Sequence, residues 1–211
     1  MYNSPIGCVN VRFISPGGRF MQRKTAKYSV ILLLIVMASP AISRADSGYP
    51  EALRAHLAGL RNMLVSIVAA MPEDKYDFRP TKEVRSFREM VLHLISDNFS
   101  HLGYAAGKSK EDSDKLAEKY MKIRTRAEML AALGDSYDYG DKVLAGLNDQ
   151  NYMDKVTAMR GEHTNRVGAV LEAFEDQMDH YGNFVVYLRL NGIVPPDTAS
   201  RDKQIDENMH H

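Results

Sequence analysis

The chain has 211 residues, of which 45% are hydrophobic and 26% are charged, and its 27 basic residues balance 27 acidic ones. This composition is that of one ordinary globular domain with a proper core, so two domains are not expected. Six basic and no acidic residues precede Asp46, which leaves 21 basic against 27 acidic residues, about −6, and no excess of positive charge for nucleic-acid binding.

Residues 21–45 have the layout of a secretory signal peptide. The basic residues at its start are Arg23, Lys24 and Lys27. An apolar run follows at 30–38, and small residues end the segment at Ser43 and Ala45, after which we expect cleavage. The alternative is an uncleaved membrane anchor, but the apolar run is about ten residues and a spanning helix needs about 20. The sequence therefore predicts a protein that is exported, periplasmic or secreted, with no membrane attachment after cleavage.

The domain boundaries follow from this segment. Residues 1–20 resemble no targeting signal and form an upstream extension, so Met21 competes with Met1 as the true start. We expect one domain at 46–200 and a polar C-terminal tail at 201–211. The sole cysteine, Cys8, lies in the extension, so the exported domain has no disulfide available.

Two helices are predicted in the first half of the domain. Leucines and other apolar residues recur at spacings of three and four from about Pro50 to Met71, the pattern of an amphipathic helix. Ser86 and Glu89 have the spacing of a capping box, so a second helix begins there and continues to about Ala106.

A long charged connection, "GKSKEDSDKLAEKYMKIR", separates the second helix from the third, and we expect at most a short helical turn in it. Thr125 and Glu128 form another capping box at the start of the third helix. The fourth helix is predicted from about Arg166 to Leu190, with Gly192 as its stop signal. No segment alternates long enough to indicate a strand. The predicted fold is all-α, a four-helix bundle with a long crossover between helices 2 and 3.

Histidines and aspartates lie one turn apart on two of these helices. His93, Asp97 and His101 share a face of the second helix, and Asp176 and His180 share a face of the fourth. Imidazole and carboxylate groups suit a divalent transition ion, and bundle cores are where such sites are built. The alternative is that these side chains are core residues with ordinary hydrogen-bond partners.

Three segments together resemble the DinB-like family, which is found in bacteria and folds as a four-helix bundle with a long crossover. They are "MPEDKYDFRPT", "RSFREMVLHLISDNFSHL" and "DHYGNFVVYLRLNGIVPP". The resemblance covers about 49–196, with the segments in the expected order.

The resemblance implies a divalent metal ion, most often zinc or nickel, bound by one histidine on the second helix and two on the last. His93 and His180 match two of these positions, while Asp176 stands where the family has a histidine. A carboxylate can also ligate, which would leave open positions for water or substrate. The alternative is a member that has lost the metal site. Asp97 and His101 extend the His93 face and are expected to line the pocket or support the ligands.

Two functions remain open from the sequence. One is a metal-dependent hydrolase or transferase acting on an unidentified small molecule. The other is a non-catalytic structural or binding bundle. The resemblance implies characterised relatives in the wider superfamily that include thiol-dependent transferases and a maleylpyruvate isomerase of the cytosol, whereas this chain has the features of an exported protein. The resemblance also implies relatives that often pair through helix faces, so one expectation is a homodimer using apolar residues of the fourth helix, and the alternative is that the bundle core absorbs all of them. These are Phe174, Met178, Phe184 and Val185.

Overall fold

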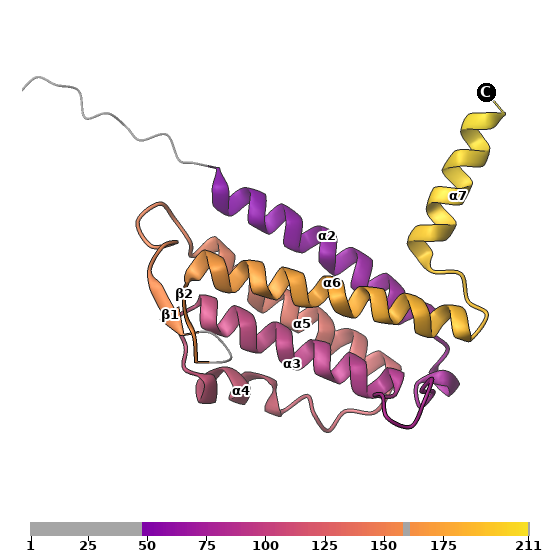
Figure 1. Cartoon of the computed structure of the whole chain (residues 1–211), viewed down its shortest axis with the longest axis horizontal. Coiled ribbons are helices and arrows are strands. Elements are labelled where there is room, and N and C mark those ends of the chain that lie inside the picture. The colour runs from indigo at the N-terminus through magenta and orange to yellow at the C-terminus, as the bar shows by residue number, and fades with distance from the viewer. Residues whose placement is uncertain (1–47, 158–160, 211) are drawn as a thin grey trace, which may run out of the picture. The chain divides into compact units, whose positions relative to one another are not determined.

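Four long helices form most of the structure, which is a computed structural model describing residues 48–157 and 161–210. They are α2 (Tyr49–Ala70), α3 (Phe87–Ala105), α5 (Arg126–Ala145) and α6 (Arg166–Leu190), shown in Figure 1. The predicted all-α fold is confirmed. The extension and signal peptide predicted at 1–45 lie outside the described residues.

Each long helix buries one apolar stripe in a shared core. Leu57 and Leu64 of α2, Leu94 of α3, Leu133 of α5 and Phe184 of α6 are almost fully buried. Because α3 packs against both α5 and α6, its side chains lie close to the centre of the bundle. Residues on the α6 side of α3 are therefore well placed to form an internal site.

Two helices, α3 and α5, begin at the predicted capping boxes. Ser86 and Thr125 each accept a hydrogen bond from the backbone N–H of the glutamate three residues later, Glu89 and Glu128, and those glutamates accept in return. Asn165 caps α6 by accepting from the N–H of Gly168. These caps satisfy backbone groups that would otherwise lack partners and so fix where each helix starts.

The connection between α3 and α5 is more ordered than predicted. It contains α4 (Lys110–Glu118), which packs against α3. A Cβ atom added at Gly103 of α3 would clash with the side chain of Ser113 of α4, so the two helices approach where a glycine permits it. The expectation of at most a short turn was therefore wrong, because α4 buries only the small residues Ser113 and Ala117 and has no long apolar stripe.

Two short strands join α5 to α6, although no strand was predicted. β1 (Lys155–Thr157) pairs antiparallel with β2 (His163–Asn165). Three residues are too few for an alternating pattern to be recognised. β2 ends at Asn165, the residue that caps α6, so the hairpin leads directly into that helix.

Two smaller helices complete the description. The 3-10 helix η1 (Glu73–Lys75) lies between α2 and α3, and α7 (Pro196–Met209) includes most of the residues predicted as a polar tail. No residue of α7 is buried, and Tyr181 of α6 donates a hydrogen bond to Asp197 at its start, at 2.8 Å. Among the described residues, no helix is both long and apolar enough to cross a membrane.

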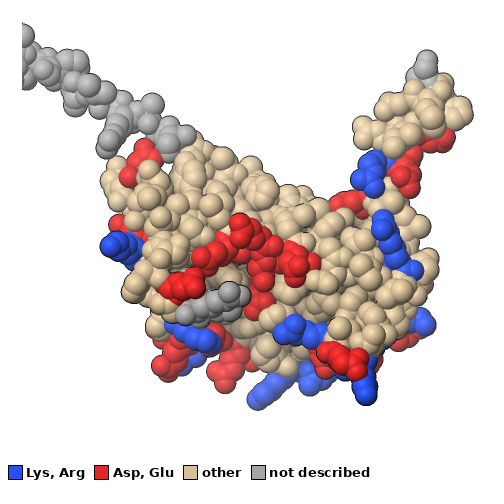
Figure 2. Space-filling view, viewed as in Figure 1, with Lys and Arg blue, Asp and Glu red and all other residues tan. Residues whose placement is uncertain are grey.

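The acidic composition is visible on the surface. Figure 2 shows acidic side chains gathered across the middle of one face, with basic side chains mainly at its edges. The absence of nucleic-acid binding stays a prediction.

Candidate metal centre

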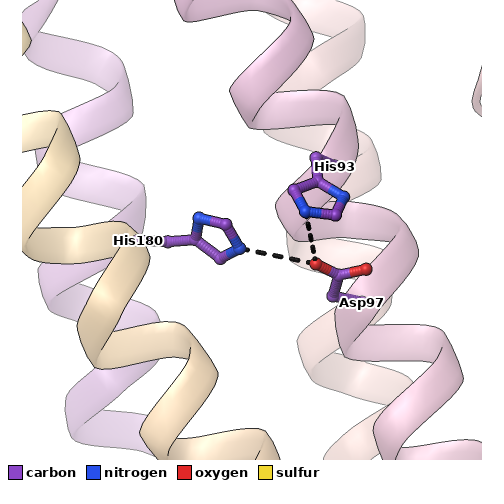
Figure 3. A group of neighbouring side chains, drawn as sticks. All are labelled: His93, Asp97 and His180. Carbon is purple, nitrogen blue, oxygen red and sulfur yellow. Dashed lines mark hydrogen bonds and ion pairs between the residues drawn. The ribbon is translucent and has the colours of Figure 1, made fainter. Parts of the chain in front are cut away.

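Three side chains from two helices meet inside the bundle. The Oδ2 atom of Asp97 lies 3.1 Å from Nε2 of His93, one turn earlier on α3, and 3.4 Å from Nε2 of His180 on α6 (Figure 3). The imidazole rings of His93 and His180 are 5.1 Å apart between centroids and nearly perpendicular. One potential ligand atom from each residue falls within 4.8 Å of the others.

The packing of α3 against α6 explains the meeting. Tyr187, near the end of α6, donates a hydrogen bond to the carbonyl of Arg85 just before α3 begins. The end of α3 lies near the start of α6, where Arg166 approaches Gly107. The helices are therefore antiparallel, and the face carrying His93 and Asp97 is opposite the face carrying His180.

The three side chains differ in exposure. The side chains of Asp97 and His180 are 10% and 8% exposed, whereas that of His93 is 32% exposed. The group is thus closed by protein on the Asp97 side and accessible beside His93.

Burial lowers the pKa of both histidines and nearby carboxylates raise it, but the net effect differs between His93 and His180. Burial lowers the pKa of His93, and the attraction of Asp97 only partly offsets it. Burial also lowers the pKa of His180, but the hydrogen bond to Asp97 and the nearby carboxylate of Asp176 outweigh this, so its pKa is raised. Both imidazoles therefore contact the Asp97 carboxylate, but the pKa of His93 is lowered and that of His180 is raised.

Asp176, the predicted third ligand, contacts only His180 within this group. Its Oδ2 atom lies 3.5 Å from Nε2 of His180, is buried, and has no hydrogen bond from any described residue. Burial raises the pKa of this carboxyl group. The compact group of three contains Asp97 instead of Asp176. The role of Asp176 as a ligand stays a prediction.

His101, which was expected to line the pocket or support the ligands, lies one turn beyond Asp97 and is 8% exposed. Its Nδ1 atom is buried without a hydrogen-bond partner within the described ranges. His101 is outside the compact group of three.

A buried polar network beside the site was not predicted. Asn98, next to Asp97, donates to the Ser136 hydroxyl at 3.0 Å, and Tyr137 donates to Oε1 of Gln177, next to Asp176, at 3.0 Å. The only sequence signal was the presence of Asn98 and Gln177 at core-facing positions of their helices. These bonds link α5 to both helices that carry the candidate ligands.

A cavity of about 740 Å³ opens beside His180. Its walls come from the loop before α3, from Met90 of α3 and from the second half of α6, and they mix apolar, amide and charged side chains. This volume is within the range of small-molecule sites.

The donor set fits a divalent transition ion. Two imidazole nitrogens and one carboxylate oxygen are competent ligands, and three protein ligands with open positions are typical of catalytic metal sites. The buried Asp176 oxygen, which lacks a hydrogen-bond donor, supplies further negative charge close to His180. The arrangement can therefore hold a cation and leave room for a small molecule.

Comparisons with known proteins agree with this architecture. A Bacillus subtilis DinB-like protein is 16% identical, with a TM-score of 0.55 over 67% of this chain and 92% of that one. A protein assigned to the DinB family from Exiguobacterium sibiricum is 21% identical, with a TM-score of 0.55 over 70% and 95% of the two chains. A Bacillus cereus DinB-like protein is 11% identical, with a TM-score of 0.59 over 69% and 95%.

These identities show a shared fold alone, and no curated protein matches the sequence significantly. The sequence itself shows the family. Residues 56–183, more than half of the chain, match the DinB superfamily. The chain belongs to the DinB superfamily.

Proposed function

We propose that this protein binds a divalent metal ion, zinc or nickel, and uses it in a hydrolase or transferase reaction on a small molecule. The observation that carries the proposal is the convergence of ligand atoms from His93, Asp97 and His180 within 4.8 Å of one another. His180 also lines the 740 Å³ cavity, so substrate would bind next to the ligands.

The residues of the chain have separable tasks in this proposal. His93, Asp97 and His180 hold the ion, and Asp176 adds negative charge beside His180. A bound ion would polarise a substrate oxygen or lower the pKa of a bound water. The cavity walls orient the substrate, and the buried Asp97 side excludes water from one side of the ion.

A non-catalytic binding or structural role is the second candidate, and one observation favours it. The Oδ2 atom of Asp97 is already within 3.4 Å of both imidazoles, so the cluster forms a self-contained polar network without an ion. Such a network can stabilise the α3–α6 interface by itself.

Turnover assays on metal-loaded protein distinguish the two functions. The substrates are a panel of small esters, lactones and amides, and a panel of electrophiles offered with low-molecular-weight thiols. The catalytic proposal predicts turnover that requires the ion and is lost in His180→Ala. Metal binding without turnover on either panel would favour the binding module.

Export is part of the same proposal, supported by the basic and apolar pattern of residues 21–45. Expression of the full chain in a bacterial host, followed by fractionation and intact-mass measurement, tests it. We expect periplasmic or secreted protein beginning at Asp46. Full-length protein in the cytosol would contradict export.

A homodimer stays a prediction. Two of the four apolar residues on which it rested, Phe174 and Phe184, are buried in the core of the bundle, whereas Met178 is 45% exposed. Any pairing face on α6 therefore depends on its exposed apolar residues rather than on those two phenylalanines.

A further inference from the structure

The cavity beside His180 contains an arginine with no acidic partner. Arg85 lines this cavity and forms no ion pair with any residue that the structure describes. Arg54, Arg79 and Arg88 each pair with a carboxylate within 3.1 Å. Arg189, which lines a different cavity, is like Arg85 in having no ion pair with a described residue. An arginine without a partner in a concave site is available to a ligand, because its planar guanidinium can donate two parallel hydrogen bonds to one carboxylate.

The backbone of Arg85 is fixed from two directions. Its carbonyl accepts a hydrogen bond of 2.6 Å from the Tyr187 hydroxyl of α6, and the next residue, Ser86, caps α3. The guanidinium is also close enough to act electrostatically on His93. The base of this side chain is therefore held at the cavity, near the candidate ligands.

Two carboxylates line the same cavity, but each has another partner. Glu83 lies 3.8 Å from the ammonium group of Lys82, and Asp179 accepts a hydrogen bond of 3.2 Å from Asn183. They leave Arg85 unpaired, and with two carboxylates against one arginine the lining carries no net positive charge. Both acids repel any anion, but they repel a doubly charged phosphate more strongly than a singly charged carboxylate, so the carboxylate is the better fit for Arg85.

We propose that Arg85 binds the carboxylate of a small organic acid in this cavity. The apolar part of the molecule lies against Val84, Met90 and Val186, which line the same walls. The opposite end of the molecule reaches His180 and the ion beside it. This last step rests on the proposed function, whereas the contact with Arg85 does not need the ion.

Two probes of nearly the same size distinguish the effect of a negative charge on binding from the effect of shape. Benzoate and benzamide have nearly the same size, but only benzoate carries a negative charge. Each is titrated into the metal-free protein and into zinc-loaded protein, with binding followed by the amide NMR signals of residues 83–90 and 179–187. The variants are Arg85→Gln and, as a matched control, Arg189→Gln, which removes an arginine that lines a different cavity.

We expect benzoate to bind the metal-free wild type and to shift these signals, with benzamide binding much more weakly. Arg85→Gln should weaken benzoate binding roughly tenfold or more, the effect of losing a charge-assisted hydrogen bond, and Arg189→Gln should not. No benzoate binding, equal binding of the two probes, or equal binding by wild type and Arg85→Gln would overturn the inference.

A zinc titration of the same samples keeps this inference separate from the proposed function. Arg85→Gln should still bind zinc, because Arg85 is not a ligand. If zinc binds but the benzoate result fails, only the carboxylate site is wrong. If benzoate binds through Arg85 but zinc does not bind, the proposed function fails and the carboxylate site remains.

Discussion

Asp97 and Asp176 approach the same atom, Nε2 of His180, from different directions. Asp97 also reaches His93, so one carboxylate oxygen bridges both helices, whereas Asp176 lies on the same helix as His180 and contacts only that histidine within the cluster. A ligand must lie close to the other ligands, and this favours Asp97.

Replacement of each aspartate by asparagine tests the assignment. Asp97→Asn should lower zinc affinity by roughly a hundredfold or more, because it removes a charged ligand, and Asp176→Asn by about tenfold, because it removes only a nearby charge. Calorimetric titration of the two variants measures the difference. The reverse order would make Asp176 the ligand, as the family resemblance implied.

Tyr137 offers a second test at this scale. Its hydroxyl donates to Gln177 at 3.0 Å, and Tyr137→Phe would leave the buried Oε1 atom of Gln177 without that donor. We expect a loss of about 1–3 kcal/mol in the free energy of unfolding, measured by urea denaturation.

Tyr104→Phe is the matched control. The Tyr104 side chain is 2% exposed, and its hydroxyl has no hydrogen-bond partner among residues 48–157 and 161–210. Its removal should change stability by less than about 0.5 kcal/mol, since no hydrogen bond is lost. Equal losses in the two variants would mean that the bond to Gln177 contributes nothing specific.

Part of the site could be predicted from sequence and part could not. Helical spacing placed His93 with Asp97 and Asp176 with His180, because residues four apart share a helix face. Spacing does not fix the rotation and offset of α3 against α6, and these decide which carboxylate lies between the histidines. The unpaired state of Arg85 depends on contacts across the fold, which no local pattern records.

At the scale of elements, the capping boxes connect helix stability to pH. The Ser86 backbone N–H donates to Glu89 and lowers the pKa of its carboxyl group from the ordinary value of 4.5, and Arg79 lowers it further. A carboxyl group with a lower pKa in the folded state adds stability above its unfolded pKa, and this stability is lost as the pH falls through the folded pKa.

Glu89→Gln should therefore reduce the acid sensitivity of the protein. Unfolding free energies measured between about pH 6 and pH 3 should fall more steeply for the wild type than for the variant. Glu83→Gln is the control, because it also removes a carboxylate before α3 but Glu83 is not part of the cap. Parallel curves for wild type and Glu89→Gln would contradict a charged cap at α3.

Two helix glycines should respond oppositely to alanine. Gly103→Ala would force the added methyl group into Ser113 of α4, and we expect a loss of roughly 1–2 kcal/mol in stability. Gly59→Ala adds a methyl group with no neighbour within 4 Å on an exposed face of α2, and we expect a gain of about 0.5–1 kcal/mol. Thermal unfolding of both variants measures the difference. A gain in both would show that α4 does not pack tightly on α3.

The helices differ in how well they can be predicted from sequence. The start and end of α6 at Arg166 and Leu190 match the prediction, because a stop signal at Gly192 ends a long helical segment. α4 and α7 bury little or nothing, so they lack such a stripe. The strands β1 and β2 are held by pairing with each other, which a reading of local periodicity does not detect.

At the scale of the whole molecule, the bundle does not need an ion for its core. Apolar side chains from α2, α3, α5 and α6 fill the interior, and the candidate ligands lie between only two of these helices. Variants of the ligands should therefore remain folded, and circular dichroism provides that control. A loss of metal binding can then be assigned to the site itself.

The central claim is that His93, Asp97 and His180 together hold one divalent ion. The most direct measurement is the zinc stoichiometry and affinity of wild type and His180→Ala, by elemental analysis and calorimetry on folded, metal-stripped and reloaded protein. We predict about one ion per chain for the wild type and none retained by His180→Ala, because two remaining ligands rarely suffice. A wild type that binds no zinc or nickel, or a His180→Ala variant that binds as tightly as the wild type, would contradict the claim.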